Sequence, residues 1–163
     1  MKYFTISEFI KSVTAIEQRV WNGANREAED NIIALVAAVL DPLREKYGKP
    51  IKVTSGFRCK KINKNVGGEM TSQHMLGEAA DIVGYNSKTE KFGDPKENYI
   101  LGRMIVALGN FDQVIFEDVG KDNLLPGWIH VSWRRKGTNR GLIYKKRAGT
   151  KTYIKINPKE LGL

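Results

Sequence analysis

Two histidines and one aspartate are the residues of this sequence that combine most readily into a reactive site. His74 and His130 are its only histidines, and Asp81 follows the first of them by seven positions. Imidazole nitrogens and carboxylate oxygens are ligands that zinc binds at about 2.0 to 2.2 Å in a tetrahedral arrangement. Three protein ligands would leave the fourth position open to water, which is typical of a catalytic zinc site.

The two segments that carry these residues have the pattern of short strands. In the segment WIHVSW, the period of two places His130 on one face with Trp128 and Ser132. In the segment AADIV, the small Ala79 shares a face with Asp81 and leaves room for an ion beside the carboxylate. A histidine in a strand is more often a hydrogen-bonded structural residue than a ligand, so the spacing alone leaves both interpretations open.

The elements that must position these residues are predicted as helices first and strands afterwards. Apolar spacing predicts helices over residues 8–20, 26–47 and 96–108, while residues 56–70 and 84–95 have the composition of loops. Strands are predicted at IKVTS, AADIV, FDQVIFE, WIHVSW, GLIYKK and TYIKIN. This order favours an α+β fold with an antiparallel-leaning sheet, and we expect one domain over residues 1–163.

The composition sets limits on the class of protein. The chain has 163 residues, of which 41% are hydrophobic and 28% charged, as in ordinary globular proteins. No apolar run reaches the roughly 20 residues of a membrane helix. The amino terminus, with Glu8, lacks the apolar centre of a secretory signal. We therefore expect a monomer without a membrane span, made in the cytoplasm, in which the single Cys59 forms no internal disulfide.

The net charge favours a polyanionic partner. There are 27 Lys and Arg residues against 18 Asp and Glu residues, a formal charge of +9. Nucleic acid, anionic lipid and bacterial wall polymers would all be attracted to such a protein. Much of the excess lies in residues 134–136, 140 and 145–147. A run of this kind is more often a solvated face than a specific site, so a basic nucleic-acid-binding protein is an alternative rather than the main prediction.

A resemblance to a known superfamily joins these observations. The pattern Ser72-x-His74-x-x-Gly77-x-Ala79-x-Asp81, followed about fifty residues later by WIHVS, resembles the zinc peptidases. These include D-alanyl-D-alanine carboxypeptidases, phage L-alanyl-D-glutamate endopeptidases and the hedgehog amino-terminal domain. The segment VLDPLREKYGKPIKVTSGFRCKKINKNVGG is similar to the one that leads into the motif in these proteins. The resemblance extends over roughly residues 5–133 and excludes the basic tail.

The resemblance implies a fold and a metal site. The fold would be α+β and hedgehog/DD-peptidase-like, with amino-terminal helices packed on a mainly antiparallel sheet. One zinc ion per chain would be held by His74, Asp81 and His130, which match the ligand positions of the motif.

The resemblance also implies a catalytic base and a substrate-facing cation. Many relatives carry the acid shortly before the last histidine, where this chain has Pro126 instead. The hedgehog-like placement, at the end of the preceding strand, points to Glu117, with Asp118 as the alternative. Neighbouring strand residues face opposite sides, so only one of these two acids can face the site. Arg58 is at the position of a family arginine that would stabilise an oxyanion or bind a terminal carboxylate.

Four further residues near the motif have predicted roles. Ser72 leads the motif, and we expect it to contact substrate or to cap the turn. Trp128 shares a face with His130 and is predicted to touch substrate. Gln73 and Ser132 are possible residues for orienting a ligand, with an ordinary polar role equally open.

The function implied by the resemblance is zinc-dependent hydrolysis of peptidoglycan stem peptides that contain D-amino acids. Glu117 would accept the proton of a zinc-activated water and return it to the departing amine. Carboxypeptidase and endopeptidase activity both stay open. We expect a phage or prophage lysin that acts on the cell wall after release and has no specific nucleic-acid partner. The alternative within the superfamily is a zinc-containing binding domain without catalysis.

Overall fold

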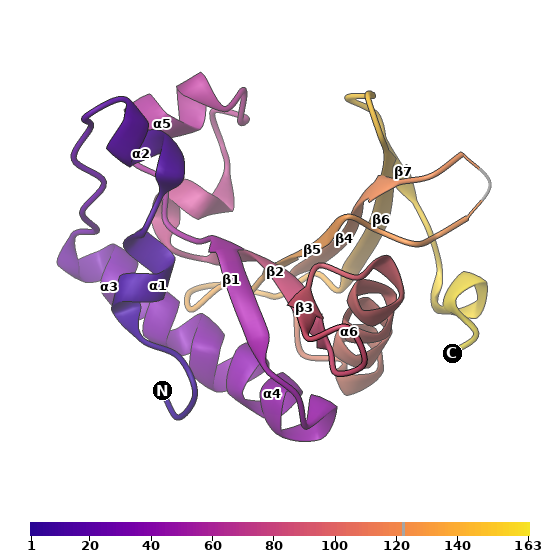
Figure 1. The fold of residues 1–163 in the computed structure, drawn as a ribbon. Helices are drawn as coiled ribbons and strands as arrows, with labels where there is room; N and C mark the ends of the chain where they lie inside the picture. Colours follow the sequence, from indigo (N-terminus) through magenta and orange to yellow (C-terminus); the bar gives the residue numbers. More distant parts are fainter. Residues whose placement is uncertain (122) are drawn as a thin grey trace.

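The computed structural model describes residues 1–121 and 123–163. Its chain begins with helices, continues with strands interrupted by further helices, and ends in a 3₁₀ turn (Figure 1). None of the described helices is long and apolar enough to cross a bilayer. Within the described residues the strands are β1 Ile51–Ser55, β2 Ala79–Asn86, β3 Lys91–Phe92, β4 Gln113–Val119, β5 Trp128–Ser132, β6 Leu142–Arg147 and β7 Tyr153–Lys155. The fold is therefore α+β, as predicted.

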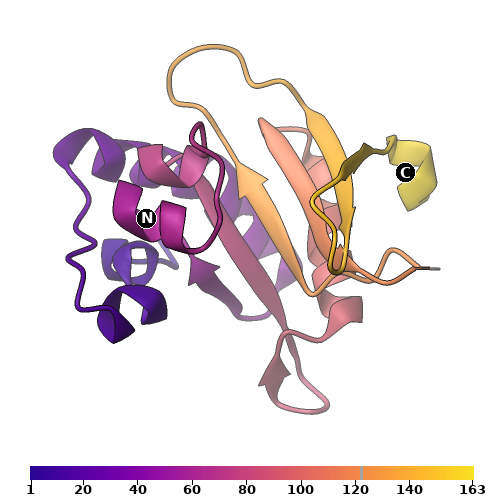
Figure 2. The same ribbon diagram turned by 90° about the horizontal axis from the view of Figure 1, so that it is seen from above.

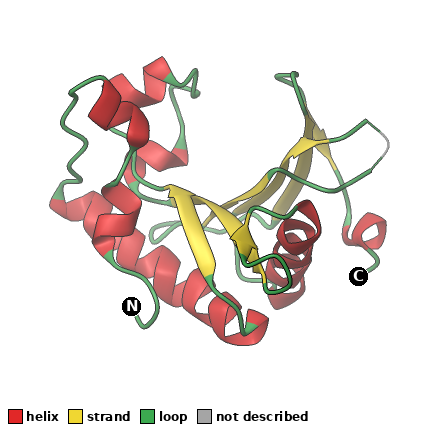
Figure 3. Cartoon of the chain, in the orientation of Figure 1, coloured by secondary structure: helices red, strands yellow, loops and turns green. Residues whose placement is uncertain are grey.

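The sheet is mixed, and most of its strand pairs are antiparallel. Its strand order is β1-β2-β5-β4-β6-β7, with β3 paired to β2. Among the described pairs only β4 and β6 run parallel. The basic tail is thus part of the sheet, because β6 pairs with β4 and carries β7 at its outer edge (Figure 3). The prediction of a mainly antiparallel sheet is confirmed.

The predicted helix over residues 8–20 is wrong in one respect, because it is broken in two. Helix α1 is Ile6–Ile10 and helix α2 is Val13–Glu17. Ser12 between them has an extended backbone, and its hydroxyl accepts a hydrogen bond from Ala15 N at 3.2 Å. A serine side chain that caps a new helix competes with continuation of the old one. As a result, Val13 and Ile16, expected on the buried side, are exposed.

The predicted helix over residues 26–47 is confirmed as a continuous helical segment with an irregular middle. Its parts are α3 Arg26–Leu35, the π-helical turn η1 Val36–Leu40 and α4 Asp41–Tyr47. Pro42 has no N–H to give to the carbonyl of Ala38, four residues earlier. That carbonyl instead accepts a hydrogen bond from Asn110 Nδ2 at 3.0 Å.

Helix α6, Pro95–Leu108, packs on the face of the sheet that carries the core, together with α3 and α4 (Figures 1 and 2). Its approach is close at Gly102, where an added Cβ would lie 2.6 Å from the Phe116 ring and 2.8 Å from Ile129 Cδ1. The two predicted loops contain additional short elements. Residues 56–70 include α5 Lys60–Asn65, and residues 84–95 include the end of β2 and β3. Two 3₁₀ turns complete the described elements, η2 Gln73–Leu76 and η3 Pro158–Leu161.

Candidate metal centre

Three side chains meet where β2, β5 and η2 come together. Strands β2 and β5 are antiparallel neighbours, and their register places Asp81 opposite His130. The turn η2 brings in His74, which lies 56 positions before His130. His74 Nε2 is 3.1 Å from His130 Nδ1 and 3.3 Å from Asp81 Oδ1, and His130 Nδ1 is 3.0 Å from Asp81 Oδ1. All three side chains are largely buried.

The hydrogen bonding of His74 leaves one ring nitrogen available as a ligand. His74 Nδ1 lies 2.7 Å from the carbonyl oxygen of Gly56. A carbonyl can only accept, so Nδ1 carries the hydrogen and, in the neutral ring, Nε2 presents a lone pair to the centre. Burial lowers the pKa of His74, although the charge of Asp81 opposes this, so the neutral form is favoured near pH 7.

The spacing of the three atoms fits a zinc ion. In a tetrahedron with bonds of about 2.0 to 2.2 Å, two ligand atoms are about 3.3 to 3.6 Å apart. The three distances here, 3.0 to 3.3 Å, are slightly shorter than that and need only a small expansion. Among the described residues, His74, Asp81 and His130 are the histidine and carboxylate group that could hold a metal. Two imidazoles and one carboxylate are also the donor types that zinc prefers.

Asp81 divides its carboxylate between this centre and a cation. Oδ1 faces the two histidines, and Oδ2 accepts a hydrogen bond from Arg58 Nη2 at 2.6 Å. Arg58 Nε donates to Ser55 Oγ at 2.8 Å, which fixes the guanidinium in place. Burial disfavours the charged carboxylate, but the two imidazoles outweigh it and hold the pKa of Asp81 well below its usual range. The sequence did not reveal that Arg58 would be bonded to Asp81.

Steric constraints explain why the motif has glycine at position 77. Gly77 ends η2 with φ +73°, in the left-handed region. A Cβ at this position would lie 2.3 Å from the carbonyl oxygen of Ala28 on α3. The turn is also tied to α3 by Asn31 Nδ2, which donates to Leu76 O at 2.8 Å. These contacts hold the backbone next to His74 against the helix layer.

A cavity of about 650 Å³ lies over the three residues. One wall comes from the segment between α5 and η2, and the other from β6 and β7 at the far edge of the sheet. Figure 1 shows these two parts at opposite ends of the sheet. Ser72 and Trp128 line it, as their predicted roles require. Ser72 makes no side-chain cap to η2, so the capping alternative is not realised.

Gln73 and Ser132, the two residues considered for orienting a ligand, make no described hydrogen bond to His74, Asp81 or His130. Gln73 Nε2 donates to Glu78 Oε2 at 3.3 Å. Ser132 Oγ is buried and has no hydrogen-bond partner within the part of the chain that the structure describes. Neither residue therefore has a described hydrogen bond that would orient His74, Asp81 or His130.

Of the two acids considered for the role of base, Glu117 and Asp118, Glu117 faces the cavity. In the β4–β5 register, Ile115 is opposite His130 and Glu117 is opposite Trp128. Glu117 is 7% exposed and lines the cavity, whereas Asp118 is exposed and does not. Asp118 has φ +58° at an irregularity of the β4–β6 pairing, which separates the two acids further.

Lys146 is a neighbour of Glu117 that sequence reasoning missed. Its Nζ lies 3.1 Å from Glu117 Oε2. Burial raises the pKa of the Glu117 carboxyl, and the charge of Lys146 opposes that rise. The alternation of LIYKKR places Lys146 on one face with Tyr144, and both line the cavity. The segment GLIYKK was predicted as a strand, but its parallel pairing with β4, which brings Lys146 to Glu117, could not be read from its own pattern.

Comparison with known proteins gives one relative and one family. The zinc D-Ala-D-Ala carboxypeptidase of Streptomyces albus G is 50% identical over 44 residues, which are 26% of this chain and 17% of that relative. The aligned part thus spans far less than two thirds of the relative's length. The family model described as Peptidase M15 matches residues 2–104, well over half of the chain, and ends before Glu117 and His130. The chain belongs to the Peptidase M15 family.

Proposed function

We propose that the protein is a zinc peptidase that hydrolyses peptidoglycan stem peptides containing D-amino acids. The observation that carries the proposal is the meeting of His74, Asp81 and His130 in a cavity that also contains the buried acid Glu117. The family supports peptidase chemistry. The name of the Streptomyces relative supports a peptide with D-alanine as substrate.

The residues of the cavity have complementary roles in this proposal. A zinc ion held by the three ligands would act as a Lewis acid toward the scissile carbonyl and a water molecule. Glu117 would accept the proton of the attacking water and deliver it to the departing amine, and its raised pKa suits both steps. Arg58 would keep Asp81 oriented through its bond to Oδ2, with its predicted contact to the oxyanion as a second role. Ser72 and Trp128 would contact the peptide.

Metal binding is tested first, because hydrogen bonding would also explain why these atoms lie so close together. A proton on His130 Nδ1 would be donated to Asp81 Oδ1 and His74 Nε2 without any metal. We expect the purified full chain to retain about one zinc per molecule after dialysis, measured by mass spectrometry of the metal. His74→Ala, Asp81→Ala and His130→Ala should each lose it, while Asp118→Ala serves as the control and should keep it. Stoichiometric zinc in all three ligand variants would refute the assignment.

Activity is tested with stem peptides and with purified peptidoglycan. Mass spectrometry of the products identifies the bond, which separates release of a terminal D-alanine from cleavage of an internal bond. Glu117→Gln should retain zinc and lose about 10²-fold to 10⁴-fold in kcat, while Asp118→Asn should be near wild type. A fully active Glu117→Gln variant would move the base elsewhere. Bound zinc without cleavage by the wild type would favour the non-catalytic binding domain.

We further propose that the protein acts on the bacterial cell wall as a phage or prophage lysin. The formal charge of +9 supports attraction to anionic wall polymers. Lysis of cells to which the protein is added from outside would support this. Added salt should abolish that lysis while the activity on a short peptide stays unchanged. That the chain is a monomer of one domain, and that the fold is hedgehog-like in detail, stay predictions.

A further inference from the structure

We propose that Arg134, supported by Arg140, binds a carboxylate of the peptide substrate at the end of the cavity away from Glu117. The inference rests on the proposed function and adds to it a determinant of which peptides are accepted. Both arginines line the cavity. Both belong to the basic tail that the sequence patterns indicated to be a solvated face.

A fully buried aspartate holds the two arginines in place. Asp112 has no exposed surface and immediately precedes β4. Arg140 binds it through three donors: Nε and the backbone N lie 3.0 Å from Oδ1, and Nη2 lies 2.6 Å from Oδ2. Arg134 Nε is 3.4 Å from Oδ2 of the same carboxylate. The loop between the arginines is closed by Asn139, whose Oδ1 accepts from Arg134 N at 2.7 Å.

The charges around the cavity leave Arg134 without a counterion of its own. Of the cationic side chains described as lining it, Arg58 pairs with Asp81, Lys146 with Glu117 and Arg140 with Asp112. Arg134 shares Asp112 with Arg140, whose guanidinium already makes two hydrogen bonds to that carboxylate. Within the described residues, no hydrogen-bond partner is found for the Nη atoms of Arg134. Its side chain is 35% exposed, so a ligand can reach it.

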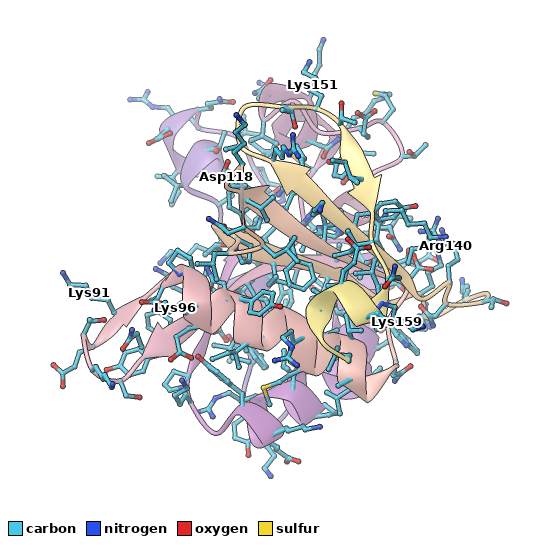
Figure 4. The ribbon with its side chains drawn as sticks, turned by 90° about the vertical axis from the view of Figure 1, so that its right-hand side faces the viewer. Lys91, Lys96, Asp118, Arg140, Lys151 and Lys159 are labelled. Carbon is cyan, nitrogen blue, oxygen red and sulfur yellow. The ribbon has the colours of Figure 1, made fainter. Side chains whose placement is uncertain are left out.

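The strand register gives the position of this cation relative to the metal centre. Strand β5 ends at Ser132, and Arg134 follows two positions later, so at most about 14 Å of extended chain separates it from His130. Glu117 is opposite Trp128, on the other side of His130. Figure 4 labels Arg140 and Asp118, the neighbour of Glu117, and shows them at opposite ends of the strands. A substrate that spans the cavity would therefore have the base at one end and the free guanidinium at the other.

A carboxylate is the group that suits this end of the cavity. Arginine presents planar paired donors that match a carboxylate, and partial burial strengthens such a bond. Arg58 is less suited, because Asp81 and Ser55 already occupy its Nη2 and Nε. A peptide residue spans at most about 3.6 Å, so a carboxylate on Arg134 would lie one to three residues from the scissile bond. Two groups are compatible: the terminal α-carboxylate, and the free carboxylate of an acidic residue within the stem.

The experiment compares acid and amide forms of the same peptides on the zinc-loaded full chain. One pair differs at the terminal carboxylate of a peptide ending in D-Ala-D-Ala, and the other at the free carboxylate of an internal D-glutamate. The variants are Arg134→Gln and Arg134→Lys. Lys136→Gln is the charge-matched control, because Lys136 pairs with the exposed Glu27 and is not among the residues that line the cavity.

In one of the two pairs, we expect wild type to have a KM about 10-fold to 100-fold lower for the acid than for the amide. Arg134→Gln should remove that preference by raising KM for the acid alone, with kcat little changed. Arg134→Lys should restore it in part, and Lys136→Gln should match wild type. The pair that responds identifies the source of the carboxylate.

Equal KM values for acid and amide in both pairs with the wild type would overturn the inference without any variant. An equal rise in KM for acid and amide in Arg134→Gln would also overturn it, since that indicates a structural effect. If wild type cleaves none of the peptides, the proposed function fails instead. Titration calorimetry of the same acids and amides then tests the carboxylate subsite separately.

Discussion

Asn98 should be one of the most sensitive polar residues of the fold, because three backbone groups depend on it. It lies on α6 with no exposed surface. Its Oδ1 accepts a hydrogen bond from Gly84 N of β2 at 2.9 Å. Its Nδ2 donates to Pro126 O at 3.2 Å and to Gly127 O at 2.7 Å. Gly127 N in turn donates to Glu117 O at 2.9 Å, so the side chain supports the entry to β5 beside the proposed base.

The cost of Asn98→Ala follows from these bonds. Each hydrogen bond contributes about 1 kcal/mol net, and a buried N–H left without a partner costs about 1 to 3 kcal/mol. Loss of the two bonds from Nδ2 costs about 2 kcal/mol and the unpaired Gly84 N–H costs about 1 to 3 kcal/mol, so the free energy of unfolding should fall by about 3 to 5 kcal/mol. Asn110→Ala is the matched control, because Asn110 also makes two side-chain bonds but is exposed. Its cost should be about 1 kcal/mol or less, since water can replace it.

Urea unfolding followed by tryptophan fluorescence measures both variants against wild type. The midpoint should fall strongly for Asn98→Ala and little for Asn110→Ala, with similar slopes. A loss below about 1 kcal/mol for Asn98→Ala would refute the reasoning. It would mean that the three backbone groups find other partners.

Two further predictions concern the site and its scaffold. Activity that needs ionised Glu117 is lost as the pH falls through the raised pKa of this carboxyl. Lys146→Met removes the positive charge that opposes the rise, so the acid limb of the kcat/KM profile should move to higher pH. An acid limb that does not move would contradict the pairing of Lys146 with Glu117. Gly77→Ala should lower the free energy of unfolding by about 2 to 4 kcal/mol, because the new residue has a positive φ and its side chain clashes with Ala28 O. Gly109→Ala is the control: Gly109 has the same φ but open space around it, so this variant should lose only about 1 kcal/mol in the same urea assay.

Local patterns predicted much of the secondary structure. The strands around Asp81 and His130 could be predicted because side chains alternate along a strand and because β-branched and aromatic residues favour it. The helix that ends at Tyr47 stops before Gly48, whose φ of +69° is typical of a helix terminus. The break at Ser12 was missed because the apolar spacing of a helix continues across it, while the cap that begins α2 depends on one hydroxyl.

The sequence by itself determined the chemical types available to the site and the face of its own strand on which each one lies. These properties are local, because they depend on neighbours a few positions apart. Together with the resemblance to the zinc peptidases, they led to the prediction of a metal centre with His74, Asp81 and His130 as ligands.

Only the tertiary structure decided which charges meet. The pairs Arg58–Asp81, Lys146–Glu117 and Arg140–Asp112 join residues 23 to 29 positions apart or bridge neighbouring strands. The parallel pairing of β6 with β4 brought the basic tail to the cavity, although the tail was outside the resemblance. The strand order depends on which distant strands pack side by side in the folded core, and no local pattern encodes it. For that reason the ligand types could be predicted from the sequence, whereas the partners that tune them could not.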